Sequence, residues 1–147
     1  MASTDSSRAL VNPWWLSVPL NPLAGLADGD NEEQVQFAHL DPNNEIEMRT
    51  VIIRHIVPYV RRIDVESVSK MKRAYMYYLS SEYFPWGGEF DSCLLPFDHP
   101  DNARSFFLWI WEECFPGVEW RIDELHQFSV NSNIEEPYKS IKLAREV

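Results

Sequence analysis

The sequence of 147 residues contains only two cysteines and five glycines. Two cysteines cannot form the disulfide framework of a small secreted domain, and we interpret Cys93 and Cys114 as buried free thiols. The scarcity of glycine argues against a backbone loop that cradles phosphates. The sequence also contains no GxGxxG, GxSxG or HExxH motif. We therefore expect no nucleotide cofactor, no metal and no enzyme activity.

Long apolar runs are missing as well. No stretch of about 18 apolar residues occurs, so we expect no segment that spans a membrane. The N-terminus lacks the apolar stretch of a signal peptide, because Pro13 interrupts its short apolar run. Together with the few cysteines, these features predict a cytoplasmic protein.

Basic residues are scarce, with 13 Lys and Arg against 23 Asp and Glu, a net charge of −10. Contacts to phosphates require clustered Lys and Arg, so this balance disfavours nucleic acids and anionic membranes and favours a basic protein partner. One basic block, Arg49 to Arg73, runs against the trend. We expect it to pair with acidic residues inside the fold rather than to form a nucleic-acid face.

Aromatic residues, by contrast, are abundant at 14% of the chain. A chain of this length with large aromatic side chains can bury a substantial core, and no linker or internal repeat divides it. We therefore predict a single domain over residues 1–147. Residues 1–10 and about 131–147 are polar and weakly patterned and could be mobile.

Residues 98–115 are predicted to form the central helix. Asp98 or Asp101 can cap its start, and Pro116 followed by Gly117 should end it. Helical spacing places a set of apolar residues on one face, which we expect to lie in the core. These residues are Ala103, Phe106, Phe107, Ile110 and Cys114.

Two further helices are predicted. The first is opened by Asp41-Pro42 and ended or kinked near Val57 by Pro58, and Glu45 and Arg49, four residues apart on it, should pair. The second is capped by Asp64 and reaches Tyr83. Alternating apolar residues predict strands. The strands fall at 14–18, within a Pro- and Trp-rich segment expected to pin itself across the core, at 34–40, and at 118–122, with 126–130 as a possible hairpin partner. The predicted fold is therefore α+β: a single compact domain of about three α-helices packed on a small, mostly antiparallel sheet with an irregular Pro/Trp-rich N-terminal segment.

Trp109 does not fit the apolar face of the central helix and points towards its polar side. Either the N-terminal segment covers Trp109, or it is an exposed anchor for a partner, since tryptophan is enriched at binding hot spots. Two neighbouring carboxylates near the helix C-terminus oppose the macrodipole, a locally unfavourable choice that hints at function. The predicted partner-binding residues are Leu108, Trp109, Glu112, Glu113, Glu119 and Asp123.

The favoured hypothesis is a small acidic inhibitor that binds another protein. Its general character resembles that of bacterial immunity proteins, short acidic proteins that neutralise a cognate toxin, often a basic nuclease, by blocking its active site. The alternatives are a self-associating structural or regulatory adaptor that forms a homodimer, a small enzyme, and least of all a nucleic-acid-binding protein. The enzyme would use the polar cluster of Cys93, Asp98, His99 and Asp101.

Overall fold

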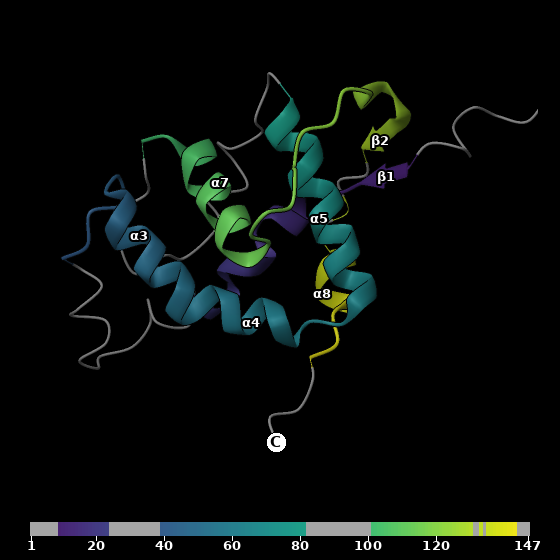
Figure 1. Cartoon of the computed structure of the whole chain (residues 1–147). Helices are drawn as coiled ribbons and strands as arrows, with labels where there is room; N and C mark the ends of the chain where they lie inside the picture. Colours follow the sequence, from purple (N-terminus) through teal and green to yellow (C-terminus); the bar gives the residue numbers. More distant parts are fainter. Residues whose placement is uncertain (1–8, 24–38, 82–100, 131–132, 134, 144–147) are drawn as a thin grey trace, which may run out of the picture.

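The computed structural model describes residues 9–23, 39–81, 101–130, 133 and 135–143, and helices or helical turns form most of them (Figure 1). Among these residues, no helix has both the length and the apolar character needed to cross a membrane. In chain order the elements are β1 (Ala9–Val11), the 3₁₀ turns η2 (Pro13–Leu16) and η3 (Val18–Leu20), α3 (Glu45–Val51), the π-helical turn η4 (Ile52–Ile56), α4 (Val57–Arg62), α5 (Val65–Ser80), α7 (Ala103–Cys114), the 3₁₀ turn η5 (Leu125–Gln127), β2 (Phe128–Val130) and α8 (Glu135–Ser140).

The predicted α+β fold with three helices on a mostly antiparallel sheet is wrong. The sheet formed by the described residues has only two short strands, β1 and β2, which run parallel, with Ala9 opposite Phe128. The expected strand at 118–122 does not form, because its backbone bonds to a side chain of α5 instead of to another strand. The Ile122 N–H donates to Ser80 Oγ at 2.9 Å. The predicted strand at 34–40 lies almost entirely outside the described residues.

The N-terminal segment forms two 3₁₀ turns instead of the predicted edge strand. The Asn12 side chain caps η2 by accepting the Trp14 N–H at 3.0 Å. Pro13 and Pro19 each lie in the first turn of their element, where their fixed φ suits a helical turn and no N–H donor is required. Alternation of apolar residues over such a short, proline-rich stretch therefore did not indicate a strand.

The helix predicted to end or kink near Val57 does not end there but continues to Arg62, with a π turn just before Pro58. It begins at Glu45, where the Asn44 side chain accepts the Glu47 N–H at 3.1 Å. The turn η4 widens to π geometry, so that the Val57 N–H bonds to the Ile52 carbonyl. Pro58, which lacks a donor and would crowd the preceding turn of a regular helix, is thereby accommodated at the start of α4.

Helices α5 and α7 occur where the sequence predicted helices. Asp64 caps α5 as expected, whereas α7 is capped by Asn102, which accepts the Ser105 N–H at 3.1 Å, and not by Asp101; Asp98 lies outside the described residues. Gly117, with φ of +79°, lies in the turn that follows α7, as predicted.

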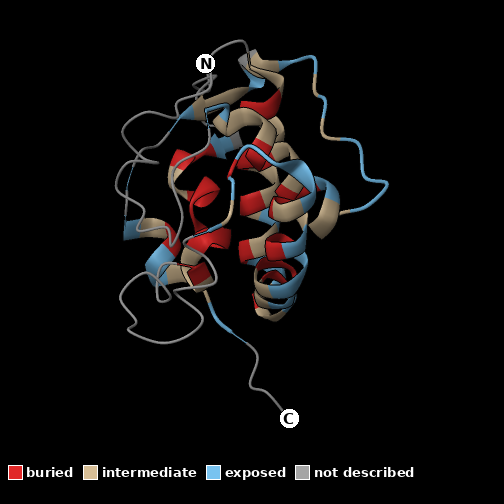
Figure 2. Ribbon diagram, turned by 90° about the vertical axis from the view of Figure 1, so that its left-hand side faces the viewer, coloured by how far each residue is buried: buried red, intermediate tan, exposed pale blue. Residues whose placement is uncertain are grey.

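The core lies where α3, α4, α5 and α7 meet around the N-terminal turns, and Figure 2 shows the buried residues gathered on the inward sides of these elements. Trp15 is 1% exposed, which confirms that the N-terminal segment is pinned into the core. The buried Tyr75 hydroxyl donates to the Leu16 carbonyl at 2.9 Å. Of the predicted α7 face, Phe106, Phe107 and Ile110 are buried, and Trp111 joins them; Ala103 and Cys114 are only half-buried.

The C-terminal tail contains α8 and then returns to the start of α5. The Asp64 N–H donates to the Lys142 carbonyl at 2.9 Å, and Asp64 Oδ1 accepts the Lys142 N–H at 2.8 Å. Ile63 and Leu143 form an isolated antiparallel bridge. The described part of the tail is therefore held against the start of α5 by hydrogen bonds to Asp64, the residue that also caps this helix.

Asp64→Ala is expected to lower the free energy of unfolding by about 1 kcal/mol, the usual cost of losing an N-cap. Hydrogen bonds, first that from the Lys142 N–H and then those from Ser67, hold the pKa of Asp64 below its ordinary value. The stabilisation is therefore fully present above about pH 4, the pKa of an unfolded Asp, and is lost as the pH falls through the folded pKa. Urea denaturation at pH 7 and at pH 3 should show a smaller difference between wild type and variant at the lower pH. Asp64→Asn, which retains a capping oxygen, should lose less at pH 7; equal losses in both variants would contradict the capping role.

Candidate partner-binding site

Four of the predicted partner-binding residues lie on α7. Leu108 and Trp109 are half-buried and pack against the core, so Trp109 is not a freely projecting anchor. Glu112 is exposed and lies two residues before the helix ends at Cys114, and Glu113 is half-buried and lies one residue before that end. Neither carboxylate is isolated, because both bond to a side chain of α3.

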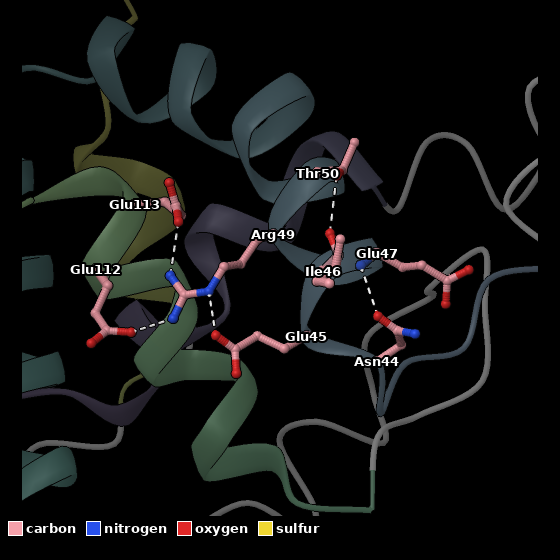
Figure 3. Close-up of polar contacts among 8 residues, drawn as sticks. All are labelled: Asn44, Glu45, Ile46, Glu47, Arg49, Thr50, Glu112 and Glu113. Atoms are coloured by element: carbon pink, nitrogen blue, oxygen red, sulfur yellow. Dashed lines mark hydrogen bonds and ion pairs between the residues drawn. The ribbon is translucent and has the colours of Figure 1, made fainter.

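Arg49 of α3 is the side chain that joins the two helices (Figure 3). Its Nη2 lies 2.6 Å from Glu112 Oε1, and its Nη1 lies 2.8 Å from Glu113 Oε2. Its Nε also bonds to Glu45 Oε2 at 2.8 Å, one helical turn earlier on α3. Burial alone would lower the pKa of Arg49, but its hydrogen bonds to Glu112, Glu113 and Glu45 raise it above the ordinary value. For Arg49, the prediction that the basic block pairs internally is confirmed.

The contacts of Arg49 with Glu112 and Glu113, which we call the Arg49 clamp, explain why two carboxylates can occupy the last turn of α7. Carboxylates near a helix C-terminus are unfavourable by roughly 0.3–1 kcal/mol each, because they face the negative end of the macrodipole. The Arg49 guanidinium contacts both and supplies the compensating positive charge. The local choice that looked unfavourable in the sequence is therefore balanced by a contact between α3 and α7.

The chain turns sharply after α7 and then continues in an extended segment. The Val118 N–H donates to the Phe115 carbonyl at 3.1 Å, and the Trp111 indole N–H donates to the Val118 carbonyl at 2.9 Å. This segment carries the remaining two predicted residues, Glu119 and Asp123, and both are exposed. Their carboxylates are therefore accessible on the surface beyond the end of α7.

A cavity of ≈ 410 Å³ opens beside this turn and brings together two of the predicted residues, Glu112 and Glu119. Asp123 instead lines a neighbouring cavity, and Leu108 and Trp109 line neither. The rest of the wall of the first cavity is mostly apolar. It consists of Trp111, Phe115, Pro116, Gly117, Val118 and Trp120.

The chemistry of this cavity suits a cation. Glu112 stands in the last turn of α7, where the macrodipole is negative, Glu119 adds a second carboxylate from the segment beyond the helix, and aromatic rings form part of the wall. The rings already attract cations of the protein itself: Lys72 Nζ lies 5.1 Å from the centroid of Phe115. Arg104 and Arg121 each lie 5.3 Å from the centroid of Trp120.

Sequence reasoning missed the partners that shape this site. Arg49 was noticed as a member of the basic block and as a helical partner of Glu45, but its distance of more than 60 residues from Glu112 hid the pairing with α7. Trp120 was assigned to a strand, although its alternation with charged residues did reflect a half-buried extended segment. The density of aromatic residues between 106 and 120 was the signal that could have indicated an aromatic-walled site.

The residues of the alternative enzyme hypothesis are only partly described. Cys93, Asp98 and His99 lie outside the described residues. Asp101 is exposed and pairs with Asn43, whose Oδ1 accepts the Asp101 N–H at 2.8 Å. In the described ranges, no three His, Cys, Asp or Glu side chains are grouped as a metal site would require.

Cys114 is the free cysteine of the described ranges, and its surroundings make it a poor nucleophile. Burial, and to a lesser degree the charge of Glu113, raises the pKa of its thiol to about 12. A reactive cysteine needs a substantial thiolate fraction near neutral pH. The geometry therefore gives Cys114 a packing role.

Comparison of the chain with protein-family models, with curated proteins and with solved structures gave no significant match.

Proposed function

We propose that the protein is a small acidic inhibitor that binds a basic protein partner at the cavity beside the C-terminal end of α7. The observation that carries the proposal is the placement of Glu112 and Glu119 on one cavity with aromatic walls. A Lys or Arg side chain of the partner would enter this cavity, pair with the carboxylates and contact the face of an aromatic ring. The net charge of −10 would speed the encounter with a basic protein.

Glu112 can take part although Arg49 already holds it. Arg49 bonds to Oε1 of Glu112, and within the described ranges no side chain bonds to Oε2. A carboxylate has about four lone-pair sites, so the second oxygen can accept a donor from the partner. The clamp would also hold the carboxylate in one place, which reduces the entropy lost on binding.

The sharpest form of the proposal is an immunity-type protein that neutralises a basic toxin, for example a nuclease, by covering its active site. Carboxylates on the inhibitor would then occupy the positions of substrate phosphates, and Glu119 and Asp123 would extend the acidic surface. A cytoplasmic location belongs to this proposal, because the half-buried free thiol of Cys114 fits a reducing compartment.

Affinity capture with the full chain as bait should retain one stoichiometric basic protein at about 50 mM salt and lose it at about 500 mM. Glu112→Gln with Glu119→Gln should weaken the complex at least tenfold, since truncating charged partners at an interface commonly costs that much. Glu66→Gln with Glu135→Gln makes the same charge change at exposed sites of α5 and α8 and should bind like wild type. A complex insensitive to both salt and the first pair, or no partner at all, would overturn the proposal. Toxicity of the freed partner that co-expression of this chain relieves would support the immunity form.

A further inference from the structure

The basic block of the sequence is only partly used by the fold. Arg49 is bound to carboxylates, but Lys72 and Arg73 form no ion pair with a described carboxylate. Lys72 contacts the Phe115 ring, and Arg73 donates to the Leu10 carbonyl at 3.3 Å. In a protein with a net charge of −10, two neighbouring cations with no carboxylate partner among the described residues form a local exception.

Both cations line an apolar groove along α5. The groove has a volume of ≈ 430 Å³ and is open to solvent. Val65, Val68 and Met76 form its floor along one stripe of the helix. Its opposite wall consists of Ile122, from the extended segment after α7, and Phe128, from β2. We call this site the α5 groove.

The α5 groove exposes apolar surface that the described fold does not cover. Val65 at its end is 86% exposed. Val130, two residues beyond Phe128 on β2 and hence on the same face of that strand, is 51% exposed. Apolar surface beside charged rims is typical of an interaction site.

We propose that the α5 groove binds an acidic amphipathic helix of another protein. Val65 to Met76 spans about 16 Å along α5, which matches roughly three turns of a bound helix. Such a helix would place apolar residues at positions i, i+3 or i+4 and i+7 in the groove, and its Asp or Glu residues would pair with Lys72 and Arg73.

The shape and charge of the site favour a helix over the other occupants. A lipid bilayer is flat and would not enter a groove walled by Ile122 and Phe128, and the net charge of −10 repels anionic membranes. A nucleic acid would leave the apolar floor unused. This site has the opposite charge preference to the cavity that Glu112 lines, and the two sites adjoin at the contact between Lys72 and Phe115. The proposal for the α5 groove does not rest on the proposed function.

The test uses the full chain and a displayed library of helical peptides with apolar residues fixed at i, i+4 and i+7 and all other positions random. Wild type should enrich peptides rich in Asp and Glu. The affinity of the best peptide, measured by fluorescence anisotropy, should fall at least tenfold with Val65→Asp and with Lys72→Glu. Val65→Asp should leave the fold intact, because the side chain is exposed and an acidic residue suits the first turn of a helix.

Two matched controls separate the groove from general effects. Ile46→Asp makes the same kind of change at an apolar residue of α3 that is 80% exposed, and Arg54→Glu reverses an exposed charge of η4. Both should retain wild-type affinity. Enrichment of basic or neutral peptides, or a best peptide insensitive to Val65→Asp, would overturn the proposal. Binding to vesicles of anionic phospholipid without peptide binding would also overturn it and would identify a lipid surface as the occupant. A solution mass that rises with protein concentration, and that Val65→Asp returns to the monomer value, would instead identify a second copy of this chain.

Discussion

Trp15→Ala is expected to lower the free energy of unfolding by about 3–5 kcal/mol, the usual cost of deleting a fully buried large aromatic side chain. Trp15 is 1% exposed and lies in η2, against α5. Its indole N–H also donates to Glu136 Oε1 at 2.9 Å, so the variant loses a contact with α8 in addition to core volume. Because small domains are stable by only about 5–15 kcal/mol, a loss of this size would leave the protein marginal.

Urea denaturation followed by far-UV circular dichroism would measure this effect without depending on tryptophan fluorescence. Trp15→Phe should cost less than Trp15→Ala, because the ring still fills part of the site while the bond to Glu136 is lost. Trp14→Ala is the matched control, since Trp14 lies in the same turn but is only half-buried. If Trp14→Ala and Trp15→Ala were equally costly, the central position of Trp15 in the core would be refuted.

Arg49→Met is expected to lower the free energy of unfolding by about 1–3 kcal/mol, because hydrogen bonds between charged groups contribute more than neutral ones while partial exposure reduces the gain. The side chain of Arg49 is 26% exposed, and the variant leaves three carboxylates without their shared cation. Arg49→Lys should recover only part of the loss, because an ammonium cannot contact three carboxylates with the planar geometry of a guanidinium.

Double-mutant cycles would resolve the contributions of the three carboxylates. The coupling of Arg49 with Glu113, which is 24% exposed, should exceed its coupling with Glu45, which is 53% exposed and more strongly screened by water. The Glu45 pair, at a spacing of four residues on one helix, should contribute about 0.3–0.5 kcal/mol. Equal coupling for the two pairs would show that the bond to α7 adds nothing to stability.

The local features of the helices could be predicted from the sequence. Helical spacing predicted the buried face of α7, and the capping preference of aspartate predicted the start of α5 at Asp64. The Glu45–Arg49 pair was also predicted, because four residues along a helix is a short-range relation. Each of these features depends on residues within one or two helical turns of one another.

The fold class could not be predicted, because the same alternation has more than one physical cause. In residues 118–122 only Trp120 and Ile122 are half-buried, and Val118 is exposed like its charged neighbours. An extended segment that lies against the protein on one side produces this alternation without a sheet. Pro58 did not end its helix, because a π turn absorbed the misfit. The parallel pairing of β1 with β2 joins strands more than 100 residues apart, and no local pattern records such a pairing.

The candidate site was predicted in part. The sequence singled out Glu112 and Glu119, and the structure places both on one cavity. The sequence could not show that Arg49 bonds to Glu112. The sequence also emphasised Trp109, whose neighbours on a helical projection are polar. Trp109 nevertheless packs against the core, because what lies over a helix face depends on the tertiary arrangement.

The contacts between the N-terminal turns and the segment around α8 determine when this part of the fold can be completed during synthesis. The N-terminal segment bonds to residues 121 positions later at three places, through Asn12, Trp15 and Ser17. These contacts can form only after the partners 121 positions later have left the ribosome. Until then the apolar residues of η2 and η3 lack the partners that complete their burial. Closing so long a loop is also entropically costly and slows folding. We therefore expect the nascent chain to rely on protection from aggregation, and truncation before α8 to release the N-terminal turns as well as the tail.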